Sequence, residues 1–345
     1  MKAAIIGATG YGGLELLRLL THHPIFTVTS VHSYSQIGEV MTIPYPHLST
    51  FVSHSLAEVD VERIAKEADL VFLATPAGVS ANLTPSLLEA GVRVIDLSGD
   101  FRIRKPAIYE EWYNKTAAKE AVLQQAVYGL TEWKKGEIRA ANLIANPGCY
   151  ATATLLAAAP LVKNRIIEVD SLIIDAKSGV SGAGKTPTSM THFPEIHDNL
   201  YIYKVNEHQH IPEIEQMLQE WDENMKPITF STHLIPITRG IMVTLYAKAK
   251  QEITDVVLQQ VYEDSYCHSP FVRIREKGVF PSPKEVRGSN FCDIGTAYDK
   301  RTGRITIVAV IDNVMKGAAG QAVQNANLLA GIAETENLQF MPLYP

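Results

Sequence analysis

The chain has 345 residues, enough for two domains, and its 46% hydrophobic and 20% charged residues are typical of a folded globular protein. Its net charge of −6 argues against a nucleic-acid partner held on a broad basic surface. Because no apolar stretch is long enough to cross a bilayer and the first residues lead straight into a strand, we expect no signal peptide, no membrane partner and a cytoplasmic location.

The first 150 or so residues alternate strand-like and helix-like segments, which predicts a parallel sheet with crossover helices and therefore an α/β fold. The expected strands are residues 3–6, 26–31, 69–74 and 92–97. The expected helices are residues 12–20 and 80–90.

A glycine-rich segment, residues 7–13, follows the first strand and opens the first helix, which is the context of a dinucleotide-binding loop. Small residues let the backbone approach a pyrophosphate, whose charge the helix N-terminus stabilises. The alternative is an ordinary tight turn; we favour cofactor binding because the strand, the helix and the position in the chain all agree. The candidate contacts are Gly7, Thr9, Gly10, Tyr11, Gly12 and Gly13.

The end of the second strand indicates which dinucleotide binds. An acidic residue there would hold the ribose of NAD, but residues 31–38 contain none before Glu39. The hydroxyl groups of Ser33 and Ser35, with His32, could instead accept a 2′-phosphate, so NADP is favoured. Further candidate cofactor contacts stand at the end of a central strand, at Ala74, Thr75 and Pro76.

Two arginines that could bind anionic ligands are expected in turns that follow strands. Arg102 ends a Leu-Ser-Gly-Asp-Phe-Arg segment, and Arg239 stands between Thr238 and Gly240. Either guanidinium could bind a carboxylate or a phosphate bidentately, and either could equally be a solvated surface arginine.

Cys149 lies in the sequence Asn-Pro-Gly-Cys-Tyr, between an apolar run and a helix-like stretch at residues 151–159. The Pro-Gly pair marks a sharp turn, so the cysteine would stand at a helix N-terminus, where N–H groups and the helix dipole favour a thiolate. A thiolate is a strong nucleophile toward an acyl carbon. With a dinucleotide loop in the same chain, this predicts acyl chemistry on sulfur coupled to hydride transfer; Asn146 is a candidate substrate contact.

The other cysteines, Cys267 and Cys292, are far from Cys149 in the sequence. The spacing of the three matches neither a disulfide framework nor a zinc site, so we expect no metal and a reducing compartment. Cys267 and Cys292 are expected to be small buried hydrophobic residues.

Residues 179–186 match the P-loop pattern GxxxxGK[ST] and follow a strand, so a P-loop kinase is one possible function. Pro187 comes directly afterwards and is a poor continuation of the long helix that a P-loop needs. We interpret the segment as a glycine-rich active-site loop, with Lys185 as a possible phosphate contact and Gly182 as a candidate cofactor contact.

Two histidines, His208 and His210, precede a predicted helix whose first turn suits Pro212. A thiol mechanism needs an imidazole that takes the proton of Cys149 and later returns one to a developing oxyanion. Glu213 is a candidate orienter of one ring. A metal site is a weaker interpretation because no third ligand is close and there is no HExxH spacing. The sequence does not choose between the two histidines.

The second half of the chain contains longer strands, several of which alternate apolar and polar residues. This predicts a mixed or antiparallel sheet with one covered face. The expected strands are residues 171–176, 228–235, 240–250, 291–298 and 304–312. The expected helices are residues 212–224, 254–266 and 317–332.

Taken together, these motifs resemble the N-acetyl-gamma-glutamyl-phosphate reductase family along nearly the whole chain. The resemblance rests on residues 7–13, 97–102, 146–152, 179–185, 208–213, 233–240 and 312–322. It implies a Rossmann-type parallel-sheet nucleotide domain and an α+β catalytic and oligomerisation domain with a mixed sheet. The expected nucleotide domain is residues 1–148 with the returning segment 313–345, and the expected catalytic domain is residues 149–312.

The resemblance also implies a reaction: NADPH-dependent reduction of N-acetyl-glutamyl 5-phosphate to N-acetyl-glutamate 5-semialdehyde and inorganic phosphate, through a Cys149 thioester, in arginine biosynthesis. His208 or His210 is the implied acid/base. The candidates for the anionic ends of the substrate are Arg102, Lys185 and Arg239, and the implied cofactor contacts of the returning segment are Asn313, Lys316 and Gly317. Tyr34 stands where we expect an arginine in relatives, so recognition of the 2′-phosphate departs from the family pattern.

Three alternatives remain beside this function. A sister reductase acting on aspartyl phosphate or on a carrier-bound aminoadipyl phosphate would share the mechanism. A P-loop kinase would use residues 179–186. A non-catalytic NADP-sensing protein would not need Cys149. The resemblance further implies a homo-oligomer, a dimer or a tetramer.

Overall fold

The computed structural model describes residues 1–34 and 36–344 and divides the chain into two compact units. The first unit comprises Met1–Pro147 and Ala318–Gln339. The second unit comprises Gly148–Gly317 and the residues from Phe340 onward. Among the described residues, no helix is both long enough and apolar enough to cross a membrane.

The place where the chain returns to the first unit differs from the expected one. We expected the return at residue 313, but residues 313–317 belong to the second unit, because the amide of Asn313 is bonded there. The residues from Phe340 also belong to the second unit, since Leu343 N–H donates to a backbone carbonyl of that unit.

The described part of the first unit contains a seven-stranded sheet in the order β3-β2-β1-β4-β5-β7-β6, with all neighbouring strands parallel. Its strands are β1 (Lys2–Ile6), β2 (Thr27–His32), β3 (Leu56–Ala57), β4 (Leu70–Leu73), β5 (Arg93–Asp96), β6 (Ala126–Tyr128) and β7 (Leu143–Ala145). The strand order reverses between β1 and β4, so their carboxyl ends form the topological switch point at which such sheets bind ligands.

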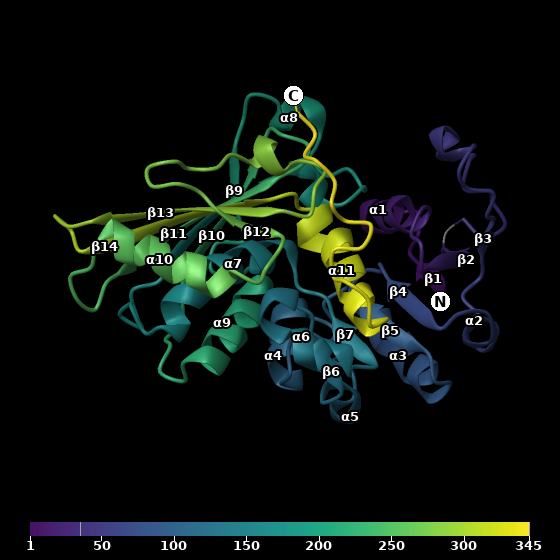
Figure 1. The fold of residues 1–345 in the computed structure, drawn as a ribbon. Helices are drawn as coiled ribbons and strands as arrows, with labels where there is room; N and C mark the ends of the chain where they lie inside the picture. The colour runs from purple at the N-terminus through teal and green to yellow at the C-terminus, as the bar shows by residue number, and fades with distance from the viewer. Residues whose placement is uncertain (35, 345) are drawn as a thin grey trace. The chain divides into compact units, whose positions relative to one another are not determined.

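Helices cover this sheet (Figure 1). They are α1 (Tyr11–Leu20), α2 (Val61–Glu67), α3 (Ser80–Glu89), α4 (Pro106–Tyr113), α5 (Glu120–Leu123), α6 (Thr131–Arg139) and α11 (Gly320–Leu329). Every residue of β4 is buried, as expected for a parallel strand with helices on both faces.

The returning helix α11 is buried along its whole length although it carries four amide side chains. Asn325 Nδ2 donates to the carbonyl of Gly129 and to Asn146 Oδ1. Gln321 Nε2 donates to the same carbonyl and to Thr131 Oγ1. Because these buried amides find partners, the polar composition of the segment is compatible with an interior position.

The described part of the second unit contains a seven-stranded mixed sheet in the order β12-β13-β14-β11-β8-β10-β9. Its strands are β8 (Ile173–Gly179), β9 (Tyr201–Tyr203), β10 (Thr229–Ile235), β11 (Ile241–Lys248), β12 (Val272–Ile274), β13 (Cys292–Asp299) and β14 (Arg304–Ile311). The β8–β10 and β12–β13 pairs are parallel, and the other pairs are antiparallel.

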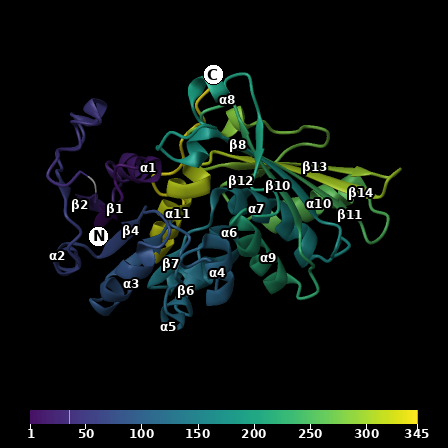
Figure 2. The same cartoon turned by 180° about the vertical axis from the view of Figure 1, so that it is seen from behind.

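The helices α7 and α10 pack against one face of the mixed sheet, and α9 packs against α7; both views show the three helices on the same side (Figures 1 and 2). The helices of this unit are α7 (Cys149–Lys163), α8 (Phe193–Ile196), α9 (His210–Trp221) and α10 (Asp255–Tyr266). Residues along β11 alternate between buried and half-buried, so the predicted sheet with one covered face is confirmed. The α/β class and the two-sheet architecture are confirmed as well.

Two details of the second unit differ from the sequence-based expectation. Cys267 was expected to be buried, but it is exposed, because it lies just past the end of α10, where its thiol donates to Asp264 O. The closing helix was expected from residue 317, but Met315–Ala319 form a π-helical turn before α11 begins. Cys292 is buried as expected.

Candidate active site

Cys149 is the first residue of α7, and Gly148 before it is the extended N-cap residue. The backbone N–H and the hydroxyl of Thr152 both donate to the carbonyl of Gly148, which closes the first helical turn. Cys149 is half-buried, whereas the residues that follow it through Val162 are buried. The thiol therefore stands where the N–H groups of a helix start favour negative charge.

Glu213, in the first turn of α9, connects that helix to the start of α7. Its fully buried carboxylate accepts a hydrogen bond from Gly148 N–H through Oε1, at 2.8 Å. Its Oε2 is 4.0 Å from Nε2 of His210. The carboxylate thus holds the residue before Cys149 and lies within ion-pair distance of an imidazole.

His210 is the imidazole next to the turn that precedes Cys149. A methyl group on Gly148 would overlap with the His210 ring, so only a glycine leaves room for the ring at this place. His210 is buried, and the edge of Tyr150 packs against it with ring centroids 6.1 Å apart. The structure therefore brings Cys149, His210 and Glu213 together at the meeting point of α7 and α9.

His208 has a different environment. Its Nδ1 accepts a hydrogen bond from the backbone N–H of His210, at 3.1 Å, and the two rings lie 4.7 Å apart. Burial, and secondarily the neighbouring His210, lower the pKa of His208 to about 2. An imidazole that stays neutral and accepts from its neighbour's backbone suits a supporting role, so His210 is the better placed of the two candidates; the acid/base assignment stays a prediction.

The returning segment forms part of the surroundings of Cys149. A methyl group on Gly317 would be 2.8 Å from Cys149 Cβ, so the backbone itself packs against Cys149 there. The amide of Asn313 accepts from Gly240 N–H and donates to Ser181 Oγ. Lys316 is fully buried, with Nζ 5.8 Å from the centre of the Phe271 ring. Cofactor contacts by Asn313, Lys316 and Gly317 stay predictions.

The glycine-rich segment that resembles a P-loop has another conformation. Val180 N–H and Ser181 N–H donate to the carbonyls of Ile237 and Thr238, so these amides are not directed at a phosphate. The four-residue 3₁₀ turn Val180–Ala183 takes the place of the long helix that a P-loop requires. The kinase hypothesis therefore loses its structural basis.

The remaining expected contacts of this segment are placed as follows. Lys185 lies on an exposed stretch, and a methyl group on Gly182 would be 2.7 Å from Ser178 Oγ. Arg239, with 22% of its side chain exposed, pairs with Asp312. Whether Lys185 or Arg239 binds substrate stays a prediction.

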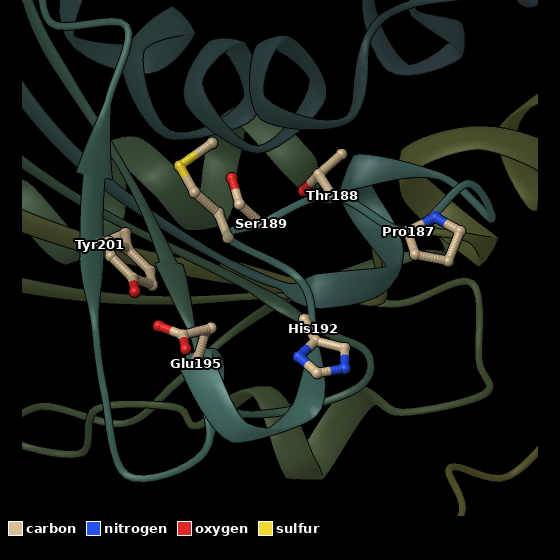
Figure 3. Close-up of a pocket in the computed structure, with 7 residues that line it drawn as sticks. Pro187, Thr188, Ser189, His192, Glu195 and Tyr201 are labelled. Carbon is tan, nitrogen blue, oxygen red and sulfur yellow. The ribbon is translucent and has the colours of Figure 1, made fainter.

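Residues that follow Lys185 in the chain line a surface pocket of about 620 Å³ (Figure 3). It is lined by Pro187, Thr188, Ser189, Met190, His192, Glu195 and Tyr201. The described residues that line this pocket do not include Cys149, His210 or Arg239, so the pocket is distinct from the Cys149 site.

In the first unit, the glycine loop closes tightly between β1 and α1. Gly7 has a φ of +87°, and a methyl group on it would be 2.8 Å from the carbonyl carbon of Ala74 at the end of β4. A methyl group on Gly13 would overlap with Gly7 O. Gly10 is the N-cap residue of α1 and has no side chain to occupy the helix start. These features fit a dinucleotide pyrophosphate approaching the backbone.

The other residues of the loop lie around this turn. Thr9 contributes its carbonyl to a hydrogen bond from Tyr45 Oη, at 2.7 Å. Tyr11 is 41% exposed, and Gly12 has open space where a side chain would stand. Thr75, at the end of β4, shares a hydrogen bond with Ser80 Oγ.

The end of β2 corrects one expectation about the 2′-phosphate. His32 is fully buried; its Nδ1 is 2.8 Å from Glu58 O and its Nε2 is 2.9 Å from Ser30 Oγ. Burial lowers the pKa of His32. Both ring nitrogens already have partners inside the unit, so neither is left to bind a phosphate. Ser33 is buried, Tyr34 is 56% exposed, and the expected contact Ser35 lies outside the described residues.

Arg102 and Asn146 both organise the end of the first unit. Arg102 donates from Nε to Asn146 O and from Nη2 to Leu97 O. The Asn146 amide donates to Ala318 O and accepts from Asn325. These contacts fix the turn that leads to Cys149; direct substrate contacts by the two side chains stay predictions.

Sequence reasoning missed two buried carboxylates with many backbone partners. Asp100 accepts from the N–H groups of Gly78 and Ala81 and from the Tyr109 hydroxyl. Asp312 accepts from Arg239 and three backbone N–H groups. Their positions after strands were visible in the sequence, but several of their partners, Gly78 and Ala81 for Asp100 and Arg239 and Gly288 for Asp312, are distant along the chain.

Comparisons with known proteins cover both units. Residues 2–141 match the family model "Semialdehyde dehydrogenase, NAD binding domain", and residues 149–313 match "Semialdehyde dehydrogenase, dimerisation domain". N-acetyl-gamma-glutamyl-phosphate reductases of Bacillus anthracis and Bacillus cereus are each 70% identical to this chain over 344 residues, which is 100% of both proteins compared.

Solved structures show the same fold at low identity. Aspartate semialdehyde dehydrogenase II from Vibrio cholerae superposes with a TM-score of 0.71 at 21% identity, covering 96% of this chain and 98% of that one. Aspartate semialdehyde dehydrogenase with NADP from Candida albicans gives a TM-score of 0.71 at 18% identity, covering 97% of this chain and 99% of that one.

Proposed function

The chain belongs to the N-acetyl-gamma-glutamyl-phosphate reductases, and from this premise we propose that it reduces N-acetyl-glutamyl 5-phosphate with NADPH to N-acetyl-glutamate 5-semialdehyde and phosphate, in arginine biosynthesis. The observation that carries the mechanism is the position of Cys149 at the start of α7, beside the buried His210 and Glu213. A nucleophile, a base and an anion-stabilising helix start are the groups that acyl transfer to sulfur needs.

In the first step, His210 takes the thiol proton and Cys149 attacks the acyl carbon, so that a carbon–sulfur bond forms. The bond between the acyl carbon and the phosphate oxygen breaks, and the phosphate leaves with the electron pair and takes a proton from the imidazolium. N–H groups in the first turn of α7 stabilise the negative charge on the carbonyl oxygen. Glu213 and the neutral His208 hold His210 in place.

In the second step, the thioester is reduced. When bound, NADPH supplies the hydride that the thioester carbon accepts. The carbonyl then re-forms from the hemithioacetal alkoxide, the carbon–sulfur bond breaks, and Cys149 leaves as a thiolate that is ready for the next substrate. The helix start that favoured this thiolate in the first step also makes it a good leaving group.

The first unit supplies the residues that would hold the cofactor. Gly7 and Gly13 keep the loop narrow, and the start of α1 at Gly10 offers N–H groups to the pyrophosphate. Ala74 and Thr75 stand beside the loop at the end of β4. With His32 engaged internally, the candidates for the 2′-phosphate are the hydroxyls that follow β2.

Arg239 is the preferred anchor for an anionic end of the substrate. Its guanidinium keeps part of its surface exposed while Asp312 holds it through Nε and Nη2. Arg102 is a weaker candidate because it already donates to two backbone carbonyls. Lys185 offers a flexible second cation.

We further infer a homo-oligomer, a dimer or a tetramer, in the cytoplasm. The match of the second unit to a dimerisation domain supports self-association. The sheet face opposite α7 supports it too, because Met242, Thr244 and Tyr246 of β11 are only half-buried in the single chain. A reducing compartment is required because Cys149 must remain a thiol.

The reverse reaction tests the proposal. We would follow NADPH absorbance with N-acetyl-glutamate semialdehyde, NADP and phosphate, and with aspartate semialdehyde in parallel. Phosphate-dependent NADPH formation from the acetylated aldehyde alone is the expected result. Activity with only the aspartyl aldehyde would keep the mechanism and change the substrate, and no activity with either from folded, NADPH-binding protein would contradict the function.

A further inference from the structure

Asp312 is a fully buried carboxylate at the point where β14 ends. Its Oδ1 accepts hydrogen bonds from the guanidinium of Arg239, at 2.9 and 3.2 Å, and from the backbone N–H groups of Val314 and Met315. Its Oδ2 accepts from Gly288 N–H, at 2.7 Å. One side chain therefore joins an arginine, the loop before β13 and the first residues of the returning segment.

The returning segment that Asp312 holds runs directly to the nucleophile. Gly317 N–H donates to the backbone carbonyl of Asp312, at 3.0 Å, across the π-helical turn. A side chain on Gly317 would collide with Cys149, at 2.8 Å from its Cβ, so the backbone of the turn packs directly against this residue and forms what we call the backbone wall at Gly317. A π-helical turn is often found at a functional site, where it places backbone in an unusual position.

The loop before β13 is shaped to meet the same carboxylate. Gly288 has a φ of +71°, a conformation that a side chain disfavours, and this directs its N–H at Asp312. Gly240, next to Arg239, donates its N–H to Asn313, the neighbour of Asp312. The cation and the turn are therefore tied to each other through residues 312 and 313.

We propose that Asp312 is a positioning residue that keeps the Arg239 guanidinium and the backbone wall at Gly317 in register with Cys149. The proposal rests on the proposed function for the roles of Cys149 as nucleophile and Arg239 as substrate anchor. Loss of the carboxylate charge leaves the Arg239 guanidinium and three buried N–H groups poorly paired. Both the guanidinium and the turn at Gly317 are therefore expected to shift.

A matched control is available in the same sheet. Asp293, on β13, is also fully buried and is held by Arg273, at 2.6 and 2.8 Å, and by Arg275. Its loss disturbs a buried carboxylate–arginine cluster but leaves the ties of Asp312 to the turn intact. Comparing Asp312→Asn with Asp293→Asn therefore separates positioning of the site from a general loss of stability.

The experiment measures three quantities on the full chain: thermal unfolding, KM and kcat in the reverse reaction, and the rate at which N-ethylmaleimide alkylates Cys149, read by mass spectrometry. In Asp312→Asn we expect KM for the aldehyde to rise about tenfold because the anchor is lost. Alkylation of Cys149 should rise about fivefold because the wall loosens. The exposed Cys267 in the same sample is an internal standard.

In Asp293→Asn we expect unfolding at a lower temperature but an unchanged KM and an unchanged alkylation rate. Equal effects of the two variants on KM and alkylation, or no effect of Asp312→Asn on either, would overturn the proposal. If Asp312→Asn does not fold, Asp312→Glu keeps the charge while shifting the turn, and the same two readouts apply. The two failures can be told apart. If the unsubstituted protein has no reductase activity, the proposed function is wrong; the alkylation rate of Cys149 needs no substrate, so it still tests whether Asp312 positions the turn.

Discussion

The ring of His210 lies directly against Gly148, so that a methyl group on this glycine would be 2.6 Å from Cε1. Gly148 precedes Cys149, and its N–H is held by Glu213. The imidazole can approach the nucleophile's turn only because this position has no side chain. The relationship between Gly148 and His210 is therefore a condition for the proton transfer that we propose.

Gly148→Ala should lower kcat about a hundredfold while the protein still binds NADPH, because the displaced imidazole no longer reaches the thiol in the right geometry. Steady-state kinetics and an NADPH titration check this. Gly136→Ala is the matched control: nothing lies within 4 Å of the added methyl group, in helix α6. It should keep full activity, and a control that lost as much activity as Gly148→Ala would contradict the argument.

The two histidines should differ in importance. His210→Asn should reduce kcat about a thousandfold, which is the range for loss of a general base. His208→Asn should cost less than about tenfold, because Asn Oδ1 can replace Nδ1 as the acceptor of His210 N–H. Single-turnover measurements of thioester formation check both. A larger loss in His208→Asn than in His210→Asn would reverse our assignment.

The sequence predicted the location of Cys149 correctly because the signals are local. A Pro-Gly turn between an apolar strand and an alanine-rich stretch specifies a helix start, and α7 begins at that residue. The long strands and the helices of ten or more residues were also predicted to within a few residues, whereas the shorter helices α2, α4 and α6 were not predicted. The strands β3, β6, β9 and β12 were missed because two or three residues are too short to show a periodic pattern.

The sequence could not choose between His208 and His210, because the choice depends on contacts between distant residues. Gly148 and Glu213 meet His210 only after α7 and α9 pack together. The role of Asp312 is equally invisible, since its partners Arg239 and Gly288 are brought to it by the sheet. His32 was misjudged because nothing local shows that its ring turns inward.

Neighbouring glycines in α1 should respond differently to a methyl group. Gly13→Ala places the methyl 2.7 Å from Ala8 Cα, so the loop must shift; we expect a stability loss of about 2 kcal/mol and weak NADPH binding. Gly12→Ala meets open space and should be stabilising by about 0.5–1 kcal/mol. If Gly12 contacts the cofactor, its variant should nevertheless bind NADPH more weakly.

Thermal unfolding and fluorescence titration with NADPH measure the two quantities separately in each variant. A stable Gly12→Ala protein with weakened binding would support a direct contact at the outer side of the loop. Normal NADPH affinity in both variants would contradict the assignment of the loop to the cofactor.

His208 should make stability depend on pH. Its pKa is about 2 in the folded chain against 6.5 as the ordinary value, because burial disfavours the charged ring. Between these values the unfolded chain binds more protons than the folded one, so the free energy of unfolding falls as the pH falls below about 6.5. The contribution is fully present above that pH, and its slope below it approaches about 1.4 kcal/mol per pH unit.

His208→Asn removes this proton-binding site and keeps the acceptor for His210 N–H. Urea unfolding at pH 5.5 and 4.5 should therefore show a smaller loss of stability in the variant, by about 1.4 kcal/mol. His23 and His32, whose pKa values burial also lowers, remain in both proteins and cancel in the comparison. If the free energy of unfolding fell equally steeply with pH in the two proteins, His208 would be protonated in the folded state. That result would contradict its supporting role as a neutral acceptor.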